Sequence, residues 1–394
     1  MRPLKTLALS TRAGLLRPSP TLSITARANA MRSEGIDVIS FAAGEPDFRT
    51  PDPICEAAIQ AIHEGFTRYT PSAGILPLRE AIAAKLEREN GVTVSPGDVI
   101  VSCGAKHSVY NSLQVLVEPG DEVILLAPYW MTYADQVRLA GATPVVVRSD
   151  AKSGFTPDIA EIRAAVTPRT RAVIVNSPSN PTGAMYDRQL LSEIVELAHR
   201  DELWIISDEI YDRLTYGVEH YSIASLGEHA RERTVTIGGC SKSYAMTGWR
   251  IGFAAAPTPV AKAMSNFQDQ VTSNPTSFAQ RGATVAFGLP REVVDSMREE
   301  FHARRDLIVR LVNDIPGLAL KPPSGAFYAF VDASAHMGGD DVKLSEHLLE
   351  SVGVATIPGS VFEGPGYLRM SYATSRENIQ AGVTRIAEAL HRLR

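Results

Sequence analysis

The sequence predicts an α/β protein of two domains, with a mainly parallel sheet of about seven strands in the large domain and an α+β arrangement in the smaller one. Its 394 residues exceed what one hydrophobic core usually serves. After residue 50, short apolar runs alternate with helical patterns, as in βαβ units. Near residue 290 this alternation stops and a long charged helix begins.

The expected strands of the large sheet are mostly about four residues long and continuously apolar, as strands buried on both faces should be. In chain order they are residues 99–101, 123–126, 145–147, 172–175, 203–206, 235–237 and 251–253. Helical stretches lie between several of them, for example 105–117, 158–166 and 187–200. Crossover helices cover a parallel sheet, so an α/β/α sandwich is expected.

The C-terminal part has a different order of elements. The charged helix at 291–314 precedes strands at 326–331 and 368–372, a helix near 343–352, and a terminal helix. We therefore expect a large domain at residues 50–290 and a small domain at 291–394. Residues 1–49 are expected to form an N-terminal arm and part of the small domain.

The composition is that of an ordinary globular protein and excludes several functional classes. The chain is 44% hydrophobic and 21% charged, with a net charge of -5 and no basic run, so we expect no nucleic-acid partner. No apolar stretch approaches the length of a membrane span. The cysteines, Cys55, Cys103 and Cys240, are too scattered for a disulfide framework or a zinc site, and the nine histidines show no paired ligand spacing.

The N-terminal segment allows two interpretations. The first 33 residues contain several arginines and hydroxyl residues but no acidic residue, which is the composition of an organelle transit peptide. Helical periodicity already begins near Leu22, however, and leads directly into residues 41–44, so little chain is left to cleave. The second interpretation, a cytoplasmic protein of bacterial type, is the one we favour.

Five polar clusters follow the expected strands. They are residues 102–106, 128–130, 176–181, 207–209 and the turn that contains Lys242. In an open parallel sheet, ligands bind beyond the carboxyl ends of the strands. The clusters are therefore expected to meet in one ligand site.

Lys242 lies in a turn of small residues, and Arg250 follows it by eight positions. Glycine and serine neighbours let a ligand approach the backbone closely, and an arginine offers a planar fork for a phosphate. An imine-forming lysine next to a phosphate anchor indicates pyridoxal 5'-phosphate (PLP) as cofactor. The alternative for this segment alone is a surface loop with two solvated cations.

Other residues of the clusters suit the same cofactor. Gly104 and Ala105 open a helix whose free N–H groups favour a phosphate, and Tyr69 is a second possible phosphate contact. Trp130 is suited to stack on an aromatic ring, or else it is a half-buried core residue. These signals are weak one by one.

Asp208 emerges from an expected buried strand, where a carboxylate needs a cationic partner. A protonated pyridine nitrogen is such a partner, although a helix N-cap is a serious alternative. Tyr211 and Asn180 can hydrogen-bond the 3'-oxygen of the cofactor. Arg369 alternates with apolar neighbours on a strand and is suited to grip a carboxylate, unless it is an edge-strand arginine that faces water.

Taken together, these residues resemble the fold-type I PLP enzymes of the class I and II aminotransferase family. The most specific motifs are residues 239–252 around Lys242, the NSPSNPTG run at 176–183, and Asp208-Glu209-Ile210-Tyr211. Within the family, residues 43–48, 128–130 and 246–252 look closest to the bacterial branch of aspartate and prephenate aminotransferases.

The resemblance implies a role for each site residue. Lys242 would be the Schiff-base lysine, Asp208 the partner of the pyridine nitrogen, Tyr211 and Asn180 the ligands of the 3'-oxygen, and Trp130 the stacking residue. The phosphate site would comprise Arg250, Gly104 and Ala105, with Tyr69 from a neighbouring subunit, and Lys106 would be a further cofactor-binding residue. Arg369, Asn180, Trp130 and the backbone of Gly44 would hold the substrate. The implied assembly is a homodimer with shared active sites.

The chain departs from the family pattern at two places. Gly239 stands where some members have a serine that touches phosphate, and residues 270–275 contain no arginine for a distal carboxylate. Arg17 is our candidate for that missing cation. We expect a two-step amino transfer from an L-amino acid, with aspartate leading, to 2-oxoglutarate. The alternatives are prephenate, aromatic acids or alanine as substrates, or a PLP-dependent cysteine-conjugate β-lyase. A PLP-sensing transcription regulator would need a DNA-binding domain, for which the sequence before residue 40 leaves no room.

Overall fold

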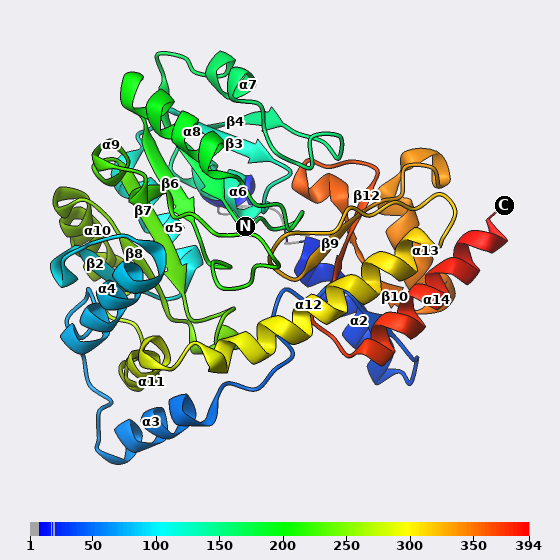
Figure 1. Ribbon diagram of the computed structural model, residues 1–394, viewed down its shortest axis with the longest axis horizontal. Helices are drawn as coiled ribbons and strands as arrows, with labels where there is room; N and C mark the ends of the chain where they lie inside the picture. Colours follow the sequence, from blue (N-terminus) through cyan, green and yellow to red (C-terminus); the bar gives the residue numbers. More distant parts are fainter. Residues whose placement is uncertain (1–7, 17, 19, 394) are drawn as a thin grey trace, which may run out of the picture.

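The computed structural model of the protein describes residues 8–16, 18 and 20–393. Figure 1 shows two parts side by side, with the long helix α12 (Glu292–Asn313) running along both. One part holds the large sheet and the other holds the C-terminal strands and helices. None of the helices in the described ranges is long and apolar enough to cross a membrane.

The large sheet has seven strands in the order β2-β8-β7-β6-β5-β3-β4. All neighbouring strands run parallel except at β8, which is antiparallel to both β2 and β7. The prediction of a mainly parallel sheet is therefore confirmed. The strands are β2 (Val99–Ser102), β3 (Glu122–Ala127), β4 (Thr143–Arg148), β5 (Thr170–Asn176), β6 (Trp204–Asp208), β7 (Thr234–Gly239) and β8 (Gly252–Ala255).

Alternate residues of the central strands pack on opposite faces of this sheet, because side chains of a strand alternate with a period of two. Val123 and Leu125 of β3 face one apolar cluster, and Ile124 and Leu126 face another. The first cluster includes α5 (Ala105–Leu116), α6 (Thr132–Leu139) and α10 (Thr258–Val271). The second includes α7 (Ile159–Ala164), α8 (Arg188–Arg200) and α9 (Glu228–Arg231). Both faces are covered, as expected for an α/β/α sandwich.

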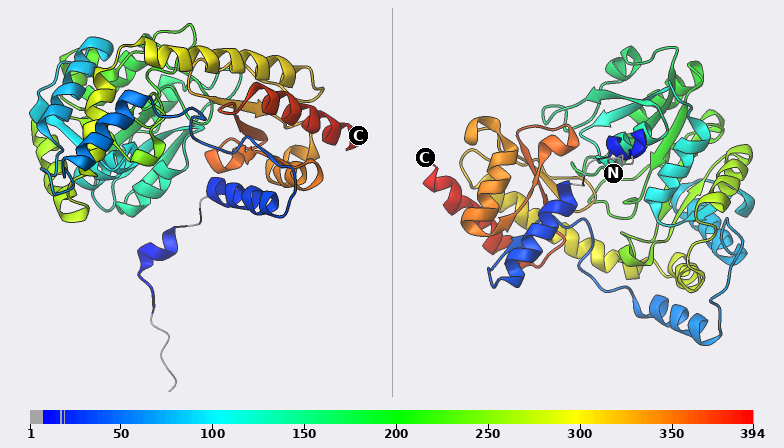
Figure 2. Two further views of the ribbon diagram at one scale, coloured as in Figure 1. Left: turned by 90° about the horizontal axis from the view of Figure 1, so that it is seen from below. Right: turned by 180° about the vertical axis from the view of Figure 1, so that it is seen from behind.

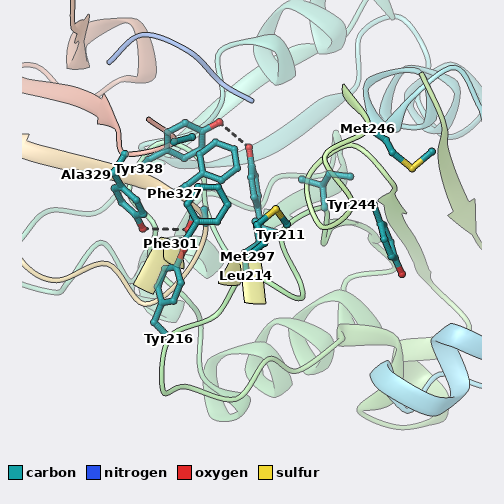
Figure 3. Close-up of a cluster of buried hydrophobic side chains, with 14 of the residues drawn as sticks. Tyr211, Leu214, Tyr216, Tyr244, Met246, Met297, Phe301, Phe327, Tyr328 and Ala329 are labelled. Atoms are coloured by element: carbon teal, nitrogen blue, oxygen red, sulfur yellow. Dashed lines mark hydrogen bonds between the residues drawn. The ribbon is translucent and has the colours of Figure 1, made fainter. Parts of the chain in front are cut away.

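A third cluster joins the large sheet to the C-terminal part. It includes Phe253 of β8. It also includes Phe301 of α12 and Phe327, together with Tyr211 and Met246 from turns beyond the sheet (Figure 3). Three further helices contribute to it: α3 (Asp52–His63), α4 (Leu76–Asn90) and α11 (Ser277–Gly288). The two parts of the chain therefore share one continuous apolar core.

The C-terminal part holds two small sheets. Strands β11 (Ile357–Pro358), β12 (Tyr367–Ser371) and β9 (Tyr328–Asp332) form an antiparallel sheet with β12 in the middle. Strand β1 (Ile39–Ser40) pairs in parallel with β10 (Val354–Ala355), so the segment near residue 40 belongs structurally with the chain's last fifty residues. Helices α13 (Asp341–Val352) and α14 (Arg376–Arg392) complete this part.

The N-terminal helices lie on different parts of the molecule. Helix α2 (Pro20–Ser33) lies against β10 and β11, and both views of Figure 2 show it beside the orange and red C-terminal elements. Helix α1 (Thr11–Leu15) lies beside α6 of the large sheet. The chain thus crosses between the two parts within its first 33 residues. The domain boundaries at residues 49 and 290 remain our proposal.

Candidate active site

A cavity of roughly 820 Å³ opens at the carboxyl ends of the sheet strands and extends to the C-terminal part. Segments that follow β2, β3, β5, β6 and β7 contribute to its wall, as do β12 and the segment around residue 44. Among the predicted site residues, those that line it are Gly44, Ala105, Lys106, Trp130, Asn180, Asp208, Tyr211, Lys242, Arg250 and Arg369. The tertiary structure therefore brings most of the predicted set into one place.

Lys242 is half-buried in the turn after β7, and its amine donates a hydrogen bond to the carbonyl of Gly44. The amine lies 5.8 Å from the ring centroid of Tyr211 and 5.7 Å from that of Phe327. Burial lowers the pKa of the amine to about 8, although the nearby Glu45 carboxylate acts to raise it. Lys242 is therefore not the solvated loop lysine of the alternative interpretation.

Asp208 ends β6 and is 3% exposed. Its Oδ2 accepts a hydrogen bond from the Tyr133 hydroxyl at 2.7 Å, and its Oδ1 accepts one from the backbone N–H of Ile210 at 3.2 Å. Burial raises the pKa of the carboxyl to about 6, and the Tyr133 hydroxyl is the strongest influence that opposes this rise. The N-cap interpretation is therefore correct only in part. Asp208 Oδ1 caps a local turn, but no α-helix begins there.

Arg369 is 2% exposed, because β12 is the middle strand of its sheet. The interpretation of an edge-strand arginine that faces water is wrong. Its Nη1 donates to Asn180 Oδ1 at 3.0 Å and its Nη2 donates to the Ala42 carbonyl at 3.1 Å. Its Nε is buried without a hydrogen-bond partner among the described residues. A planar fork with a free N–H in a cavity wall is suited to a carboxylate.

Tyr211 is connected to Arg369 through a residue that the sequence analysis did not select. Tyr211 Oη and Tyr328 Oη lie 2.9 Å apart, and Figure 3 shows the two hydroxyls pointing at one another. The Arg369 guanidinium lies 4.6 Å from the centroid of the Tyr328 ring. Burial raises the pKa of the Tyr211 hydroxyl well above its usual value, so it is a hydrogen-bond donor at neutral pH.

The first turn of α5 and Arg250 together offer donors that are suited to an anion. The first helical hydrogen bond there is that of His107 N to Gly104 O, which leaves the amides of Ala105 and Lys106 available for a ligand. Arg250 donates to the carbonyls of Thr247 at 3.0 Å and Cys103 at 3.3 Å.

The backbone conformation and the position of Arg250 both favour glycine at position 104. Its φ is +85°, and a Cβ there would lie 2.5 Å from the Arg250 guanidinium. The missing side chain therefore lets a cation lie directly on the helix N-terminus, which suits a dianionic phosphate.

A match to the family described as "Aminotransferase class I and II" covers residues 36–386. The chain belongs to this family. It is 47% identical over 390 residues to a "Probable aspartate/prephenate aminotransferase" of Aquifex aeolicus (98% of this chain, 99% of that one). It is 46% identical over 385 residues to an "Aspartate aminotransferase" of Geobacillus stearothermophilus (96% and 98%).

Solved structures of this family have the same fold. The aspartate aminotransferase of Thermus thermophilus with maleate superposes with a TM-score of 0.94 at 42% identity, covering 98% of this chain and 100% of that one. The aspartate aminotransferase of Rhizobium meliloti gives a TM-score of 0.95 at 40% identity, covering 99% and 100%. The predicted family and the fold-type I architecture are therefore confirmed.

The remaining predicted residues of this aminotransferase lie in different settings. Trp130 is half-buried in the cavity wall, and the Lys106 amine lies 4.8 Å from the centroid of its ring. Tyr69 is 91% exposed and does not line the cavity of its own chain. Arg17 lies outside the described residues.

Two tyrosines at the site were missed. Tyr328 begins β9, and its hydroxyl bonds Tyr211. Tyr133 lies in the first turn of α6, and its hydroxyl bonds Asp208. The only local signal was a tyrosine among apolar neighbours, which is also the signal of an ordinary core residue.

Proposed function

We propose that this family member is a PLP-dependent aminotransferase that moves the amino group of L-aspartate to 2-oxoglutarate in two half-reactions. The observation that carries the proposal is the convergence, in one cavity, of a lysine of lowered pKa, a buried carboxylate, and two arginines, Arg250 and Arg369, that are suited to bind anions. Relatives named aspartate aminotransferase at 46% identity support the substrate.

The cavity wall fits each part of the proposed cofactor. The N-terminus of α5 and Arg250 suit its phosphate, and Asp208 keeps acceptor capacity for a protonated pyridine nitrogen, since each oxygen has one protein donor. Tyr211 and Asn180 would hold the 3'-oxygen, and Trp130 the ring face. When bound, PLP supplies an electron sink for the bond that breaks at the substrate Cα.

The chain itself supplies the proton transfer and the substrate binding. Because burial lowers the pKa of the Lys242 amine to about 8, part of it would be uncharged near neutral pH and able to take a proton from the substrate Cα. The hydrogen bond to the Gly44 carbonyl positions this amine. Arg369 would orient the substrate through its α-carboxylate, which every amino-acid and keto-acid substrate shares.

Aspartate specificity needs a further cation for the distal carboxylate. Arg17 remains a candidate from the sequence. Lys106 is a second candidate, because it lines the cavity and makes no ion pair with a described residue. Burial and the neighbouring Arg250 lower the pKa of Lys106, so a carboxylate bound next to it would stabilise its charge. A relative solved with maleate, a four-carbon dicarboxylate, supports a dicarboxylate as substrate.

Prephenate is the second candidate substrate, because a relative at 47% identity is named aspartate/prephenate aminotransferase. Prephenate also carries two carboxylates, so the same cations would serve it.

We also propose a homodimer in which Tyr69 contributes to the neighbouring active site, since a tyrosine that is 91% exposed has little to stabilise it in a lone chain. A cytoplasmic location completes the proposal.

The test is a half-reaction on the purified holoprotein without any keto acid. Aspartate, glutamate, alanine and phenylalanine are added separately, and the absorption band of the bound cofactor is followed. Conversion to the pyridoxamine form with aspartate supports the proposal, and conversion only with phenylalanine or alanine changes the substrate. Pyruvate release from a cysteine conjugate without an acceptor indicates a β-lyase. A protein that takes up no PLP refutes the cofactor assignment.

A further inference from the structure

Tyr133 donates a buried hydrogen bond to the carboxylate that is proposed to face the cofactor. The residue is 2% exposed, and its hydroxyl lies 2.7 Å from Asp208 Oδ2. Burial and the Asp208 charge raise the pKa of this hydroxyl well above its usual value, so it keeps its proton and acts as the donor. The hydrogen bond therefore stabilises the charged form of the carboxyl.

The backbone also ties Tyr133 to the residue proposed to stack on the cofactor ring. The Tyr133 amide donates to the Trp130 carbonyl at 3.0 Å, and the two rings meet edge to face with centroids 5.4 Å apart. One turn at the start of α6 thus contacts both the carboxylate and the stacking residue.

We propose that Tyr133 is a positioning residue of the reaction: its hydroxyl holds Asp208 ionised and oriented, so that Asp208 can keep the cofactor's pyridine nitrogen protonated. The inference rests on the proposed function, because Tyr133 acts through Asp208 and is not itself proposed to contact the substrate or the cofactor. It goes further by giving a role to a side chain that the family motifs in this sequence do not single out.

The charges around Asp208 explain why this donor matters. Glu209 acts to raise the pKa of the Asp208 carboxyl, Lys242 acts to lower it, and burial raises it most. Only two hydrogen bonds from described residues reach the carboxylate oxygens, and the Ile210 amide makes the longer one, at 3.2 Å. Removing the Tyr133 hydroxyl would therefore shift the Asp208 carboxyl towards its protonated form, which is a weaker partner for a cation.

The experiment compares Tyr133→Phe with a matched control, Tyr186→Phe. Tyr186 is 5% exposed and borders the same small cavity of about 10 Å³ as Tyr133, but it makes no hydrogen bond to Asp208. Two quantities are measured: the pH midpoint of the absorption change of the bound cofactor, and the dissociation constant of PLP from the apo-protein by fluorescence.

For Tyr133→Phe we expect PLP affinity to fall about tenfold and the midpoint to rise by about one pH unit. The midpoint rises because a less positively charged pyridine ring increases the proton affinity of the Lys242 Nζ that is bound to the cofactor. Tyr186→Phe should leave both quantities at the wild-type values. If Tyr133→Phe does not fold, 3,5-difluorotyrosine at position 133, a stronger donor, should move the midpoint downward instead.

A cycle with Asp208→Asn separates positioning from packing. If Tyr133 acts through Asp208, adding Tyr133→Phe to Asp208→Asn should change the PLP affinity less than about twofold. The inference would be overturned if Tyr133→Phe lowered the PLP affinity equally in the wild-type and Asp208→Asn backgrounds. It would also be overturned if Tyr133→Phe kept wild-type values while Asp208→Asn changed both the midpoint and the affinity. Neither result would refute the proposed function. A wild-type protein that takes up no PLP would instead refute the proposed function.

Discussion

Replacing Arg369 by lysine should lower kcat/KM by a similar factor for every amino acid that the protein accepts. The reason is that Arg369 is proposed to bind the α-carboxylate, which does not vary between substrates. Its Nη1 and Nη2 each make one hydrogen bond within the protein, to Asn180 Oδ1 at 3.0 Å and to the Ala42 carbonyl at 3.1 Å. A guanidinium has five N–H donors, so three remain for a ligand.

The size of the loss follows from these contacts. Lysine keeps the charge but cannot present two parallel donors, so at least one charge-assisted hydrogen bond to the carboxylate is lost and the other weakens. Each such bond contributes about 1.5–3 kcal/mol. A net loss of about 2–4 kcal/mol corresponds to a fall of roughly 30- to 1000-fold in kcat/KM.

The assay measures kcat/KM for aspartate, alanine and phenylalanine with 2-oxoglutarate as acceptor, alongside the melting temperature of each protein. Lys106→Met is the matched control, because removal of the proposed distal cation should lower kcat/KM for aspartate and leave the monocarboxylic donors within about threefold. A loss in Arg369→Lys that is confined to aspartate, or smaller than about threefold for all donors, would show that Arg369 does not bind the shared carboxylate.

Four further predictions follow from single residues. Lys242→Ala should abolish product formation while its circular dichroism spectrum stays that of the wild type; undiminished turnover would rule out the lysine's role. In the apo-protein, Lys242→Met should be more stable than wild type near pH 7, and this difference should disappear between pH 8 and about 10.5. The reason is that the folded pKa of Lys242, about 8, lies below its unfolded value, so the free energy of unfolding of the wild type rises with pH through that window. Parallel curves of stability against pH for the two proteins would contradict this. Gly104→Ala should weaken PLP binding to the apo-protein about tenfold or more, because the new Cβ displaces the Arg250 guanidinium. The control is Gly91→Ala, where φ is +66° and the nearest neighbour atom lies at 3.6 Å; it should lower the melting temperature without changing the affinity for PLP. Lys85→Met should lower the free energy of unfolding by about 3–5 kcal/mol in a urea titration, since it leaves the Asp212 carboxylate without its buried cationic partner, and an unchanged midpoint would mean that this pair contributes nothing.

The large sheet was predictable because its signal is local. Each of the seven strands is a short apolar run between helical patterns, and the predicted runs agree with β2 to β8 to within a few residues. Helices α3, α4 and α11 were not predicted, although they supply much of the third apolar cluster. The buried positions of α4 include two polar residues, Lys85 and Asn90, so its sequence lacks a clean amphipathic pattern.

The candidate site was predictable in part for a different reason. Polar clusters that follow strands of a parallel sheet must meet at one edge, so Lys242, Asp208 and Asn180 could be grouped without coordinates. Tyr328 and Tyr133 could not be grouped in this way, because nothing in their own segments distinguishes them from core tyrosines. Only the packing of β9 and α6 brings their hydroxyls to Tyr211 and Asp208.

The sequence by itself therefore determined the family, the mainly parallel sheet and the set of residue types that converge on the cavity, since these depend on spacing along the chain. The tertiary structure decided which side chains are charged, paired or free. The strand order places Arg369 in the middle of a small sheet, where its contacts leave three of its five N–H donors, the buried Nε among them, for a ligand. Burial, which depends on the whole fold, moves the pKa values of Lys242 and Asp208 towards neutrality, because it removes water from both groups.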